Sequence, residues 1–307
     1  MAERGALRGP DPATSRIEVP ASAAGTRLDQ FLAEPLGSRA HAQRLIDEGR
    51  VRVDGRIRRK RHEVHAGELI DVDDSDQVSD APTVDVPFGV AYEDEHLIVV
   101  DKPAGVVVHP ARGHQSGTLS QALAGRAAGG DEPWRAGIVH RLDRETSGLL
   151  VVAKRDDVHR ALKALLTARL VRREYLALVQ GTPSARAGTI EAPIGRDRRN
   201  RTLMSIDSDE PREARTHFEI VEPLPSATLL RVTLDTGRTH QIRVHMQSIG
   251  HPVYGDRQYG VSDAFGLTHQ FLHAACLAFA HPVTGEGIEV NSPLPDDLAR
   301  ALVLAAV

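Results

Sequence analysis

The spacing of apolar residues near the N-terminus predicts a short amphipathic helix. Leu28, Phe31 and Leu32 stand three and four residues apart, so they share one face of a helix. Thr26 is placed to cap this helix, and Asp29 occupies the third helical position, which resembles a weak capping box. The apolar face indicates that the helix packs against a small core.

A second helix is predicted over residues 39–47, with Ser38 as its cap and an apolar face that Leu45 and Ile46 share. Alternating apolar residues then predict a short strand from Val51, which enters an Asp-Gly hairpin turn at residues 54–55. A closing strand is predicted at 69–72. Helices and short strands together indicate a small αβ unit over residues 15–74.

Longer apolar runs follow and predict a larger unit. Several of its strands succeed one another without a helix between them, which favours a mixed, largely antiparallel sheet with helices set against it, an α+β fold. The charged residues 196–215 are expected to form an irregular surface insertion. The predicted strands are 97–100, 148–153, 175–180, 217–222, 227–235 and 287–290, and the predicted helices are 118–127, 157–168, 239–249 and 296–305.

Composition adds the boundaries of these units. Residues 1–14 are rich in Gly, Pro and Ala and are expected to be a disordered tail, and residues 75–87 are acidic with two prolines, as in a linker. The larger unit is therefore expected to span 88–307. At 307 residues with 41% hydrophobic and 26% charged residues, the chain is typical of a soluble globular protein.

Targeting and redox signals are few. The single cysteine, Cys276, excludes an internal disulfide and favours a reducing, cytoplasmic location, with the thiol packed in the core. No apolar stretch approaches a membrane span, and the first residues lack the apolar middle of a signal peptide. We expect no membrane partner and a monomer.

The charge is distributed unevenly along the chain. The whole chain carries a net charge of −4, but residues 36–65 hold nine Arg or Lys against four Asp or Glu, a local charge of 9 − 4 = +5. Residues 66–95 hold ten acidic and no basic residues. Because phosphate binding depends on local potential, the basic segment predicts a nucleic-acid contact despite the negative total.

The stretch 140–154 carries the strongest chemical signal. Asp143 stands between Arg141 and Arg144, and a polar turn and an apolar run follow. A carboxylate beside guanidinium groups stays ionised and can act as a nucleophile without a metal. From these residues alone, a solvated ion pair on a surface loop is the favoured interpretation.

The stretch also resembles the catalytic motif of the pseudouridine synthases of the RluA family. Three further segments in the expected order support the resemblance, which covers roughly residues 88–300. They are Lys102-Pro103-Ala104-Gly105 continuing to His109-Pro110, Arg173-Glu174-Tyr175-Leu176-Ala177, and Thr236-Gly237-Arg238-Thr239-His240-Gln241-Ile242-Arg243. The resemblance implies an isomerase that converts uridine in RNA to pseudouridine, a redox-neutral reaction that needs no cofactor and no metal.

The resemblance also assigns catalytic roles. Asp143 is the expected nucleophile, acting at ribose C1′ or uracil C6 or by stabilising charge on the sugar. Arg243 is expected to pair with it, and Tyr175 to stack on the target base or share in a proton transfer. The plain alternatives are a structural aspartate, an exposed helix arginine and a tyrosine that serves only packing.

Three further residues are expected to bind the substrate. Ile242 matches the apolar residue that packs against uracil, although alone it would be assigned to the core. Arg141 is expected to fill the place that the flipped uridine leaves in the RNA stack, or else to contact a phosphate. His140 is the third residue that is expected to bind the substrate.

The first unit resembles the S4 RNA-binding domain over residues 38–55. This resemblance implies that the basic second helix and the loop after it contact RNA phosphates, which positions the RNA rather than reading its sequence. The alternative is a solvated basic face. The candidate RNA-binding residues are Arg39, Arg44, Arg56, Arg58, Arg59, Lys60 and Arg61.

The histidines do not predict a metal site. His240 and His245 are five residues apart, not the four of a zinc-binding helix, and the single cysteine argues against structural zinc.

An appended S4 domain is typical of family members that act on large-subunit (23S) ribosomal RNA. The alternatives are a transfer-RNA pseudouridine synthase, a ribosome assembly factor with secondary or no activity and, more distantly, a metal-dependent hydrolase.

Overall fold

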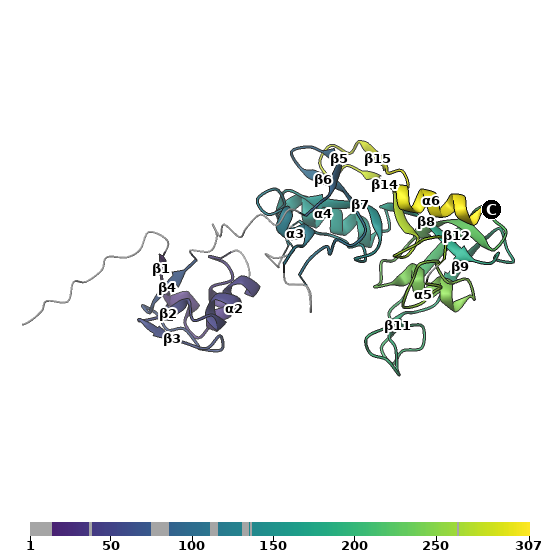
Figure 1. The fold of residues 1–307 in the computed structure, drawn as a ribbon. Helices are drawn as coiled ribbons and strands as arrows, with labels where there is room; N and C mark the ends of the chain where they lie inside the picture. The colour runs from purple at the N-terminus through teal and green to yellow at the C-terminus, as the bar shows by residue number, and fades with distance from the viewer. Residues whose placement is uncertain are drawn as a thin grey trace, which may run out of the picture. The chain divides into compact units, whose positions relative to one another are not determined.

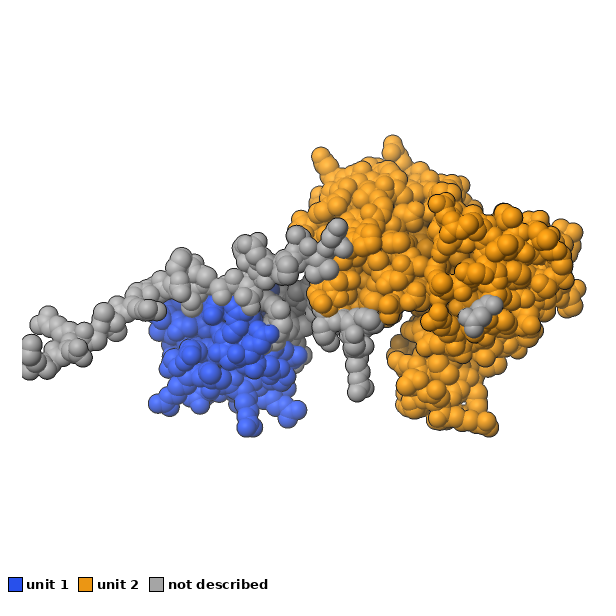
Figure 2. Space-filling model, in the orientation of Figure 1, with its two compact units in different colours: residues 1–83, 131–133 blue, residues 84–130, 134–307 orange. Residues whose placement is uncertain are grey.

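The computed structural model describes residues 14–36, 39–74, 86–110, 116–130, 135, 137–262 and 264–307. The chain divides into two compact units (Figure 2). The described residues up to 74 form unit 1, and those from 86 onward form unit 2. Among the described helices, none is both long enough and apolar enough to cross a membrane.

Unit 1 is a four-stranded sheet packed against two helices, as the apolar spacing predicts (Figure 1). Its strand order is β1-β4-β2-β3, and its core includes Leu28, Leu32 and Leu45, all fully buried. Asp54 and Gly55 both have positive φ, 47° and 76°, as an Asp-Gly hairpin turn requires. The elements are β1 (Thr14–Glu18), η1 (Ala21–Ala23), α1 (Leu28–Phe31), α2 (Arg39–Asp47), β2 (Val51–Val53), β3 (Arg56–Ile57) and β4 (Leu69–Asp73).

The start of α1 corrects one expectation. The N-cap is Arg27, with no side-chain capping bond, so the predicted cap at Thr26 is wrong. Asp29 does not close a capping box, because its buried carboxylate accepts hydrogen bonds from the guanidinium of Arg27 and from the side-chain amide of Gln43 on α2. Asp29 therefore joins the two helices. The predicted cap at Ser38 lies outside the described residues.

Unit 2 is built on a nine-stranded sheet in the order β5-β6-β7-β14-β8-β13-β12-β9, with β15 paired to β14. Every pairing is antiparallel except β7 with β14, so the predicted α+β fold with a mixed, largely antiparallel sheet is confirmed. The strands are β5 (Gly89–Glu93), β6 (Leu97–Lys102), β7 (Ser147–Ala153), β8 (Arg172–Gln180), β9 (Ala187–Glu191), β12 (Arg215–Pro223), β13 (Ala227–Leu234), β14 (Leu272–Ala280) and β15 (Gly287–Asn291). The helices are α3 (Leu119–Ala122), α4 (Asp156–Thr167), α5 (Gln241–Ser248) and α6 (Asp296–Ala305).

Both faces of the sheet are covered, which explains the unbroken apolar runs. Leu149 and Val151 of β7 pack with Val158 and Leu162 of α4 on one face. Leu150 and its neighbours on the other face pack with α3 and α5. Figure 1 shows α4 against β7 and α5 near β12. A strand buried on both faces has no polar side to alternate with.

Three departures from the predicted elements have local causes. The strand β14 was not predicted, because its apolar and small residues do not alternate in polarity, yet it lies in the middle of the sheet. The helix predicted over 118–127 ends at Ala122, shortly before Gly125 takes a positive φ of 78°. The region 196–215 contains a small hairpin of β10 (Gly195–Arg196) and β11 (Met204–Ser205).

The parallel pair β7 and β14 fixes the middle of the stretch 140–154. Ser147 stands opposite His273 and Gly148 opposite Ala274. Gly148 has a φ of 107°, and a Cβ there would collide with the carbonyl oxygen of Ala274. Only glycine fits this approach, so the loop ahead of β7 begins from a rigid point.

Candidate active site

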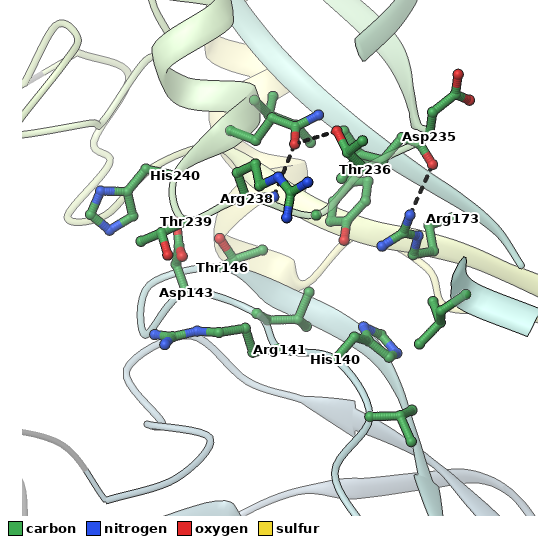
Figure 3. Close-up of a pocket in the computed structure, with 18 of the residues that line it drawn as sticks. His140, Arg141, Asp143, Thr146, Arg173, Asp235, Thr236, Arg238, Thr239 and His240 are labelled. Atoms are coloured by element: carbon green, nitrogen blue, oxygen red, sulfur yellow. Dashed lines mark hydrogen bonds between the residues drawn. The ribbon is translucent and has the colours of Figure 1, made fainter. Parts of the chain in front are cut away.

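A cavity of about 620 Å³ opens in unit 2 beside the loop that precedes β7. Its size falls within the range of about 300–1,000 Å³ found for small-molecule sites. Figure 3 shows His140, Arg141 and Asp143 on one side of the cavity and residues 235–240 on the other. The first residues of β8 and the first turn of α5 supply the rest of the wall, including Tyr175, Ile242 and Arg243.

The centre of the site is an ion pair between residues a hundred positions apart. Nη1 of Arg243 lies 3.1 Å from Oδ2 of Asp143. The side chain of Arg243 is 6% exposed and that of Asp143 is 17% exposed. A charged pair with so little water contact is held by a strong, charge-assisted hydrogen bond. Arg144, which is next to Asp143 in sequence, is not its partner in this contact.

Arg243 is itself held by a second, deeper carboxylate. Its Nε and Nη2 donate to the two oxygens of Asp256 at 2.6 and 2.9 Å, and Nη2 also donates to Gln258 at 2.9 Å. The guanidinium lies 4.9 Å from the ring centre of Tyr259. Burial opposes the charged form, but the hydrogen bond and charge of Asp256 outweigh it and raise the pKa of Arg243.

Asp256 is fully buried and receives further hydrogen bonds from the backbone N–H groups of Gln258 and Tyr259. Burial alone would raise the pKa of Asp256, but the bond from Arg243 lowers it, so the carboxylate stays ionised. No sequence pattern pointed to Asp256, Gln258 or Tyr259. The nearest signal in the sequence was the pair Gly255 and Gly260, which flank them; in the structure a Cβ at either glycine would strike a backbone oxygen.

Tyr175 and Ile242 form the apolar part of the wall. They are 6% and 4% exposed and belong to one core cluster with Leu142. Burial is the largest influence on Tyr175 and raises the pKa of its phenol, so the hydroxyl stays protonated at neutral pH. The phenol can therefore donate a hydrogen bond and offer a ring face, but it cannot serve as an ionised base.

His140 lines the cavity and is tied to the sheet. Its Nε2 accepts a hydrogen bond from the backbone N–H of Val151 on β7 at 3.2 Å. Burial, helped by the charge of Arg173, lowers the pKa of His140 to about 3. The ring is neutral, and it orients the residues that precede Asp143.

Lys102 secures the other side of the loop. Its fully buried ammonium group donates to the carbonyl oxygens of Pro103, Val106 and Arg144 at 2.9, 3.0 and 3.0 Å. Burial lowers the pKa of Lys102 to about 7, against the opposing effect of Glu145 and Asp143. Arg144, which had no expected role, joins the same loops through its carbonyl oxygen, which also accepts the N–H of Gly105 at 2.9 Å.

Two buried hydrogen bonds fix the turn after Asp143. Gln270 donates to the hydroxyl of Thr146 at 2.8 Å, and the hydroxyl of Ser147 lies 2.9 Å from Nδ1 of His273. The other ring nitrogen of His273 faces the carbonyl oxygen of Ser292 at 3.1 Å, which makes Nδ1 the acceptor for Ser147. The loop that carries Asp143 is thus bonded to three neighbouring segments.

The remaining expected residues lie at the cavity and in unit 1. Arg141 is exposed and lines the cavity. In unit 1, Arg56, Arg58, Arg59 and Arg61 are exposed, and Lys60 pairs with Asp47 at 2.7 Å. Arg39 and Arg44 lie on α2, and their side chains are outside the described part of the structure.

One group with metal-ligand chemistry was not considered in the sequence analysis. In unit 1, ligand atoms of His62, His65 and Glu68 all lie within 4.8 Å of one another. It is the one such group among the described residues. Neither His240 nor His245, the two histidines weighed as ligands from their spacing, belongs to it.

Comparisons with known proteins give a consistent result. Residues 96–248 match the family model described as RNA pseudouridylate synthase, and residues 26–70 match the S4 domain. The chain is 42% identical over 282 residues to an uncharacterized RNA pseudouridine synthase, YlyB, of Bacillus subtilis, covering 90% of this chain and 93% of that protein. It is 44% identical over 303 residues to ribosomal large subunit pseudouridine synthase D of Nitrosomonas europaea, covering 94% and 87%.

Among solved structures, the fold is similar to human RNA pseudouridylate synthase domain containing 1. The TM-score is 0.55 at 27% sequence identity, and the match covers 68% of this chain and 84% of the human one. The human match is too short to include all of unit 1 and unit 2 together. The bacterial relatives cover both units.

Proposed function

This chain belongs to the RNA pseudouridylate synthase family and carries an S4 domain, and on that basis we propose that it modifies large-subunit ribosomal RNA with Asp143 as its nucleophile. Family membership makes it a pseudouridine synthase that binds RNA. The proposal adds the target, the catalytic residues and the division into an S4 unit at 15–74 and a catalytic unit at 88–307.

The ion pair between Asp143 and Arg243 carries the catalytic part of the proposal. It places one partly buried carboxylate, bonded to a guanidinium, in a cavity large enough for a nucleotide. Arg243 holds that carboxylate in one orientation because Asp256 and Gln258 fix the guanidinium from the far side. A nucleophile at a defined position meets the main requirement for attack on ribose C1′ or uracil C6.

The other cavity residues fit the remaining steps. Tyr175 offers its ring to the base, and Ile242 of the same apolar part of the wall helps to exclude water. Arg141 is exposed at the cavity, where a planar guanidinium can occupy the stack that the flipped uridine leaves. Flipping costs a few kcal/mol, which RNA contacts elsewhere must offset.

Two observations support a ribosomal target. Several relatives that match most of this chain bear the name ribosomal large subunit pseudouridine synthase D. Unit 1 exposes a run of arginines that suits phosphate contacts without base reading. Such a module raises the effective concentration of the catalytic site near its RNA.

Mapping pseudouridine in ribosomal and transfer RNA, with and without this protein, tests the proposal. Sites in large-subunit RNA that require the wild-type protein and are absent with Asp143→Asn are the expected result. Sites confined to transfer RNA would replace the target. Bound RNA without any new pseudouridine would favour an assembly factor.

A further inference from the structure

Arg173 is a buried cation in the cavity wall that the proposed mechanism does not use. It lies on β8, is 7% exposed and lines the same cavity as Asp143. Its Nη2 donates one hydrogen bond, to the carbonyl oxygen of Leu234 at 3.0 Å. Its Nε is buried and has no hydrogen-bond partner among the residues that the structure describes.

No carboxylate in the described part of the chain forms an ion pair with Arg173. Asp235, an acidic residue of the same cavity wall, pairs instead with Arg169, Arg215 and His217. A buried charge without a counter-charge is costly to keep, because neither water nor an anion compensates it. The folded protein therefore tolerates this cost for a group that is not part of the chain.

The position of Arg173 relates it to the base. Arg173 and Tyr175 are two residues apart on β8, so both side chains point to the same face, into the cavity. Figure 3 shows Asp143 and Arg173 at opposite ends of the cavity. The pKa of Tyr175 is set mainly by burial but is influenced by both charges, the Arg173 cation lowering it and the Asp143 anion raising it.

The loop beside Arg173 also leaves it room. A Cβ at Gly237 would lie 2.9 Å from Nη1 of Arg173, so glycine avoids a crowded contact there. The guanidinium is thus fixed at one edge by Leu234 while Nε remains without a partner. A hydrogen-bond acceptor that enters the cavity meets a prepared donor.

We propose that Arg173 binds a carbonyl oxygen of the target uracil and stabilises the negative charge that develops on it. When Asp143 attacks C1′, the N1–C1′ bond breaks, and its electron pair stays with the ring and spreads from N1 onto O2 and O4. After the ring turns, C5 attacks C1′ and the bond from C1′ to the Asp143 oxygen breaks, which restores the carboxylate. The C5 proton then leaves and N1 gains a proton, so atoms and charge balance. A fixed cation near those oxygens lowers the barrier without reorganising during the reaction.

A backbone phosphate is the other anionic group that the RNA could present. The uracil is favoured because Arg173 is buried, whereas exposed arginines at the cavity, such as Arg141 and Arg169, suit hydrated phosphates. The inference rests on the proposed function, in which uridine enters this cavity next to Asp143.

The test compares Arg173→Met with Arg172→Met in the full-length protein. Arg172 is the neighbouring residue on the same strand, but it is exposed and pairs with Glu174 and Glu289 outside the cavity. Arg173→Met is expected to reduce the single-turnover rate by about 10²–10³, as for loss of one oxyanion donor, while RNA affinity stays unchanged. Arg172→Met is expected to match wild type.

Stability separates this role from a structural one. Because Arg173 carries an uncompensated buried charge, methionine should leave the melting temperature unchanged or raise it. If the melting temperature and the rate of Arg173→Met both fall strongly, Arg173 serves the fold, and the inference is overturned. Arg173→Lys keeps the charge in a different geometry and should recover part of the rate.

Substrate analogues separate uracil from phosphate. Fluorine at C5 stabilises the ring anion, so the deficit of Arg173→Met should shrink when consumption of 5-fluorouridine is followed. A methylphosphonate beside the target should weaken binding equally in wild type and variant. Loss of that weakening only in the variant, or equal deficits for both bases, would overturn the uracil assignment.

Failure of the proposed function gives a different pattern. If wild-type protein leaves ribosomal RNA unmodified, the target is wrong, and Arg173 is tested on the RNA that the mapping identifies. If Asp143→Asn retains turnover, the nucleophile is wrong. If wild type is active, Asp143→Asn is inactive and Arg173→Met is fully active, the Arg173 inference alone fails.

Discussion

Asp256→Asn tests whether the buried carboxylate behind Arg243 supports both the fold and the site. In the wild type the two oxygens of Asp256 accept from Nε and Nη2 of Arg243, and Oδ1 also accepts from the N–H groups of Gln258 and Tyr259. Asparagine keeps one acceptor oxygen and replaces the other with an NH₂ group. In either orientation of the amide, its NH₂ group faces an N–H donor of Arg243.

The size of the effect follows from burial. Asp256 is 0% exposed and Arg243 is 6% exposed, so water cannot replace the missing acceptor. Removing one partner of a buried pair costs about 3–5 kcal/mol, and we expect the lower end because Asp143 and Gln258 still contact Arg243. For a unit of this size, about 3 kcal/mol corresponds to a fall of about 6–12 °C in melting temperature.

Activity should fall as well. Asp256 fixes Arg243, and Arg243 fixes Asp143, so a shift in the guanidinium displaces the proposed nucleophile. A displacement of about 1 Å can cost about 10²-fold in rate. Calorimetry of the full chain measures the unfolding transition of unit 2, and single-turnover pseudouridine formation measures the rate.

The control is Asp157→Asn, which removes an exposed carboxylate. Its partner Arg155 lies 2.7 Å away, and both side chains are more than half exposed, at 54% and 52%. Such a surface pair contributes little. If Asp256→Asn has the same melting temperature as Asp157→Asn and reacts at the wild-type rate, the supporting role of Asp256 is refuted.

The remaining predictions concern the nucleophile, the RNA interface and acid stability. Asp143→Asn is expected to abolish turnover while filter binding shows unchanged RNA affinity, because Arg243 keeps Asp256 as its charge partner; residual turnover would exclude Asp143 as nucleophile. Replacing the basic run of unit 1, residues 58–61, by alanine should weaken RNA binding. The slope of log affinity against log salt concentration should become shallower by about 0.7–0.9 for each phosphate that the protein no longer neutralises. Arg160→Ala is the control, and an unchanged slope would show that the run is only a solvated basic face. His140 has a folded pKa of about 3 against 6.5 when unfolded, so the unfolded chain binds the extra proton between these values and stability falls as the pH drops below 6.5. Urea unfolding at pH 7 and pH 5 should therefore show a smaller acid effect for His140→Gln, and equal effects would contradict the assignment. The four alanine substitutions in the basic run of unit 1 are Arg58→Ala, Arg59→Ala, Lys60→Ala and Arg61→Ala.

Local patterns predicted much of the fold. The helical spacing of Leu28 and Leu32, the Asp-Gly turn at Asp54 and the apolar runs of β6 and β7 each appear in the structure where the sequence placed them. These features depend on neighbours within a few residues. The errors were also local, since Thr26 offered a capping side chain that the chain entering α1 does not use.

Long-range partners were beyond the reach of periodicity. The strand β14 joins β7 in parallel and β8 in antiparallel pairing, and no local signal specified either neighbour. The pair of Asp143 with Arg243 was expected only through family resemblance. Asp256 behind it, and the uncompensated charge of Arg173, were not expected at all.

The sequence by itself determined the periodic elements, the tight turns and the set of reactive side chains, because these depend on backbone sterics and on chemistry that each residue carries. The tertiary structure decided which of those side chains meet. It gave Asp143 a partner a hundred residues away rather than the arginines near it in sequence, and among the described residues it left the Nε of Arg173 without a hydrogen-bond partner. Strand order and burial determine such pairings, because they set which charges lie close together and which are removed from water.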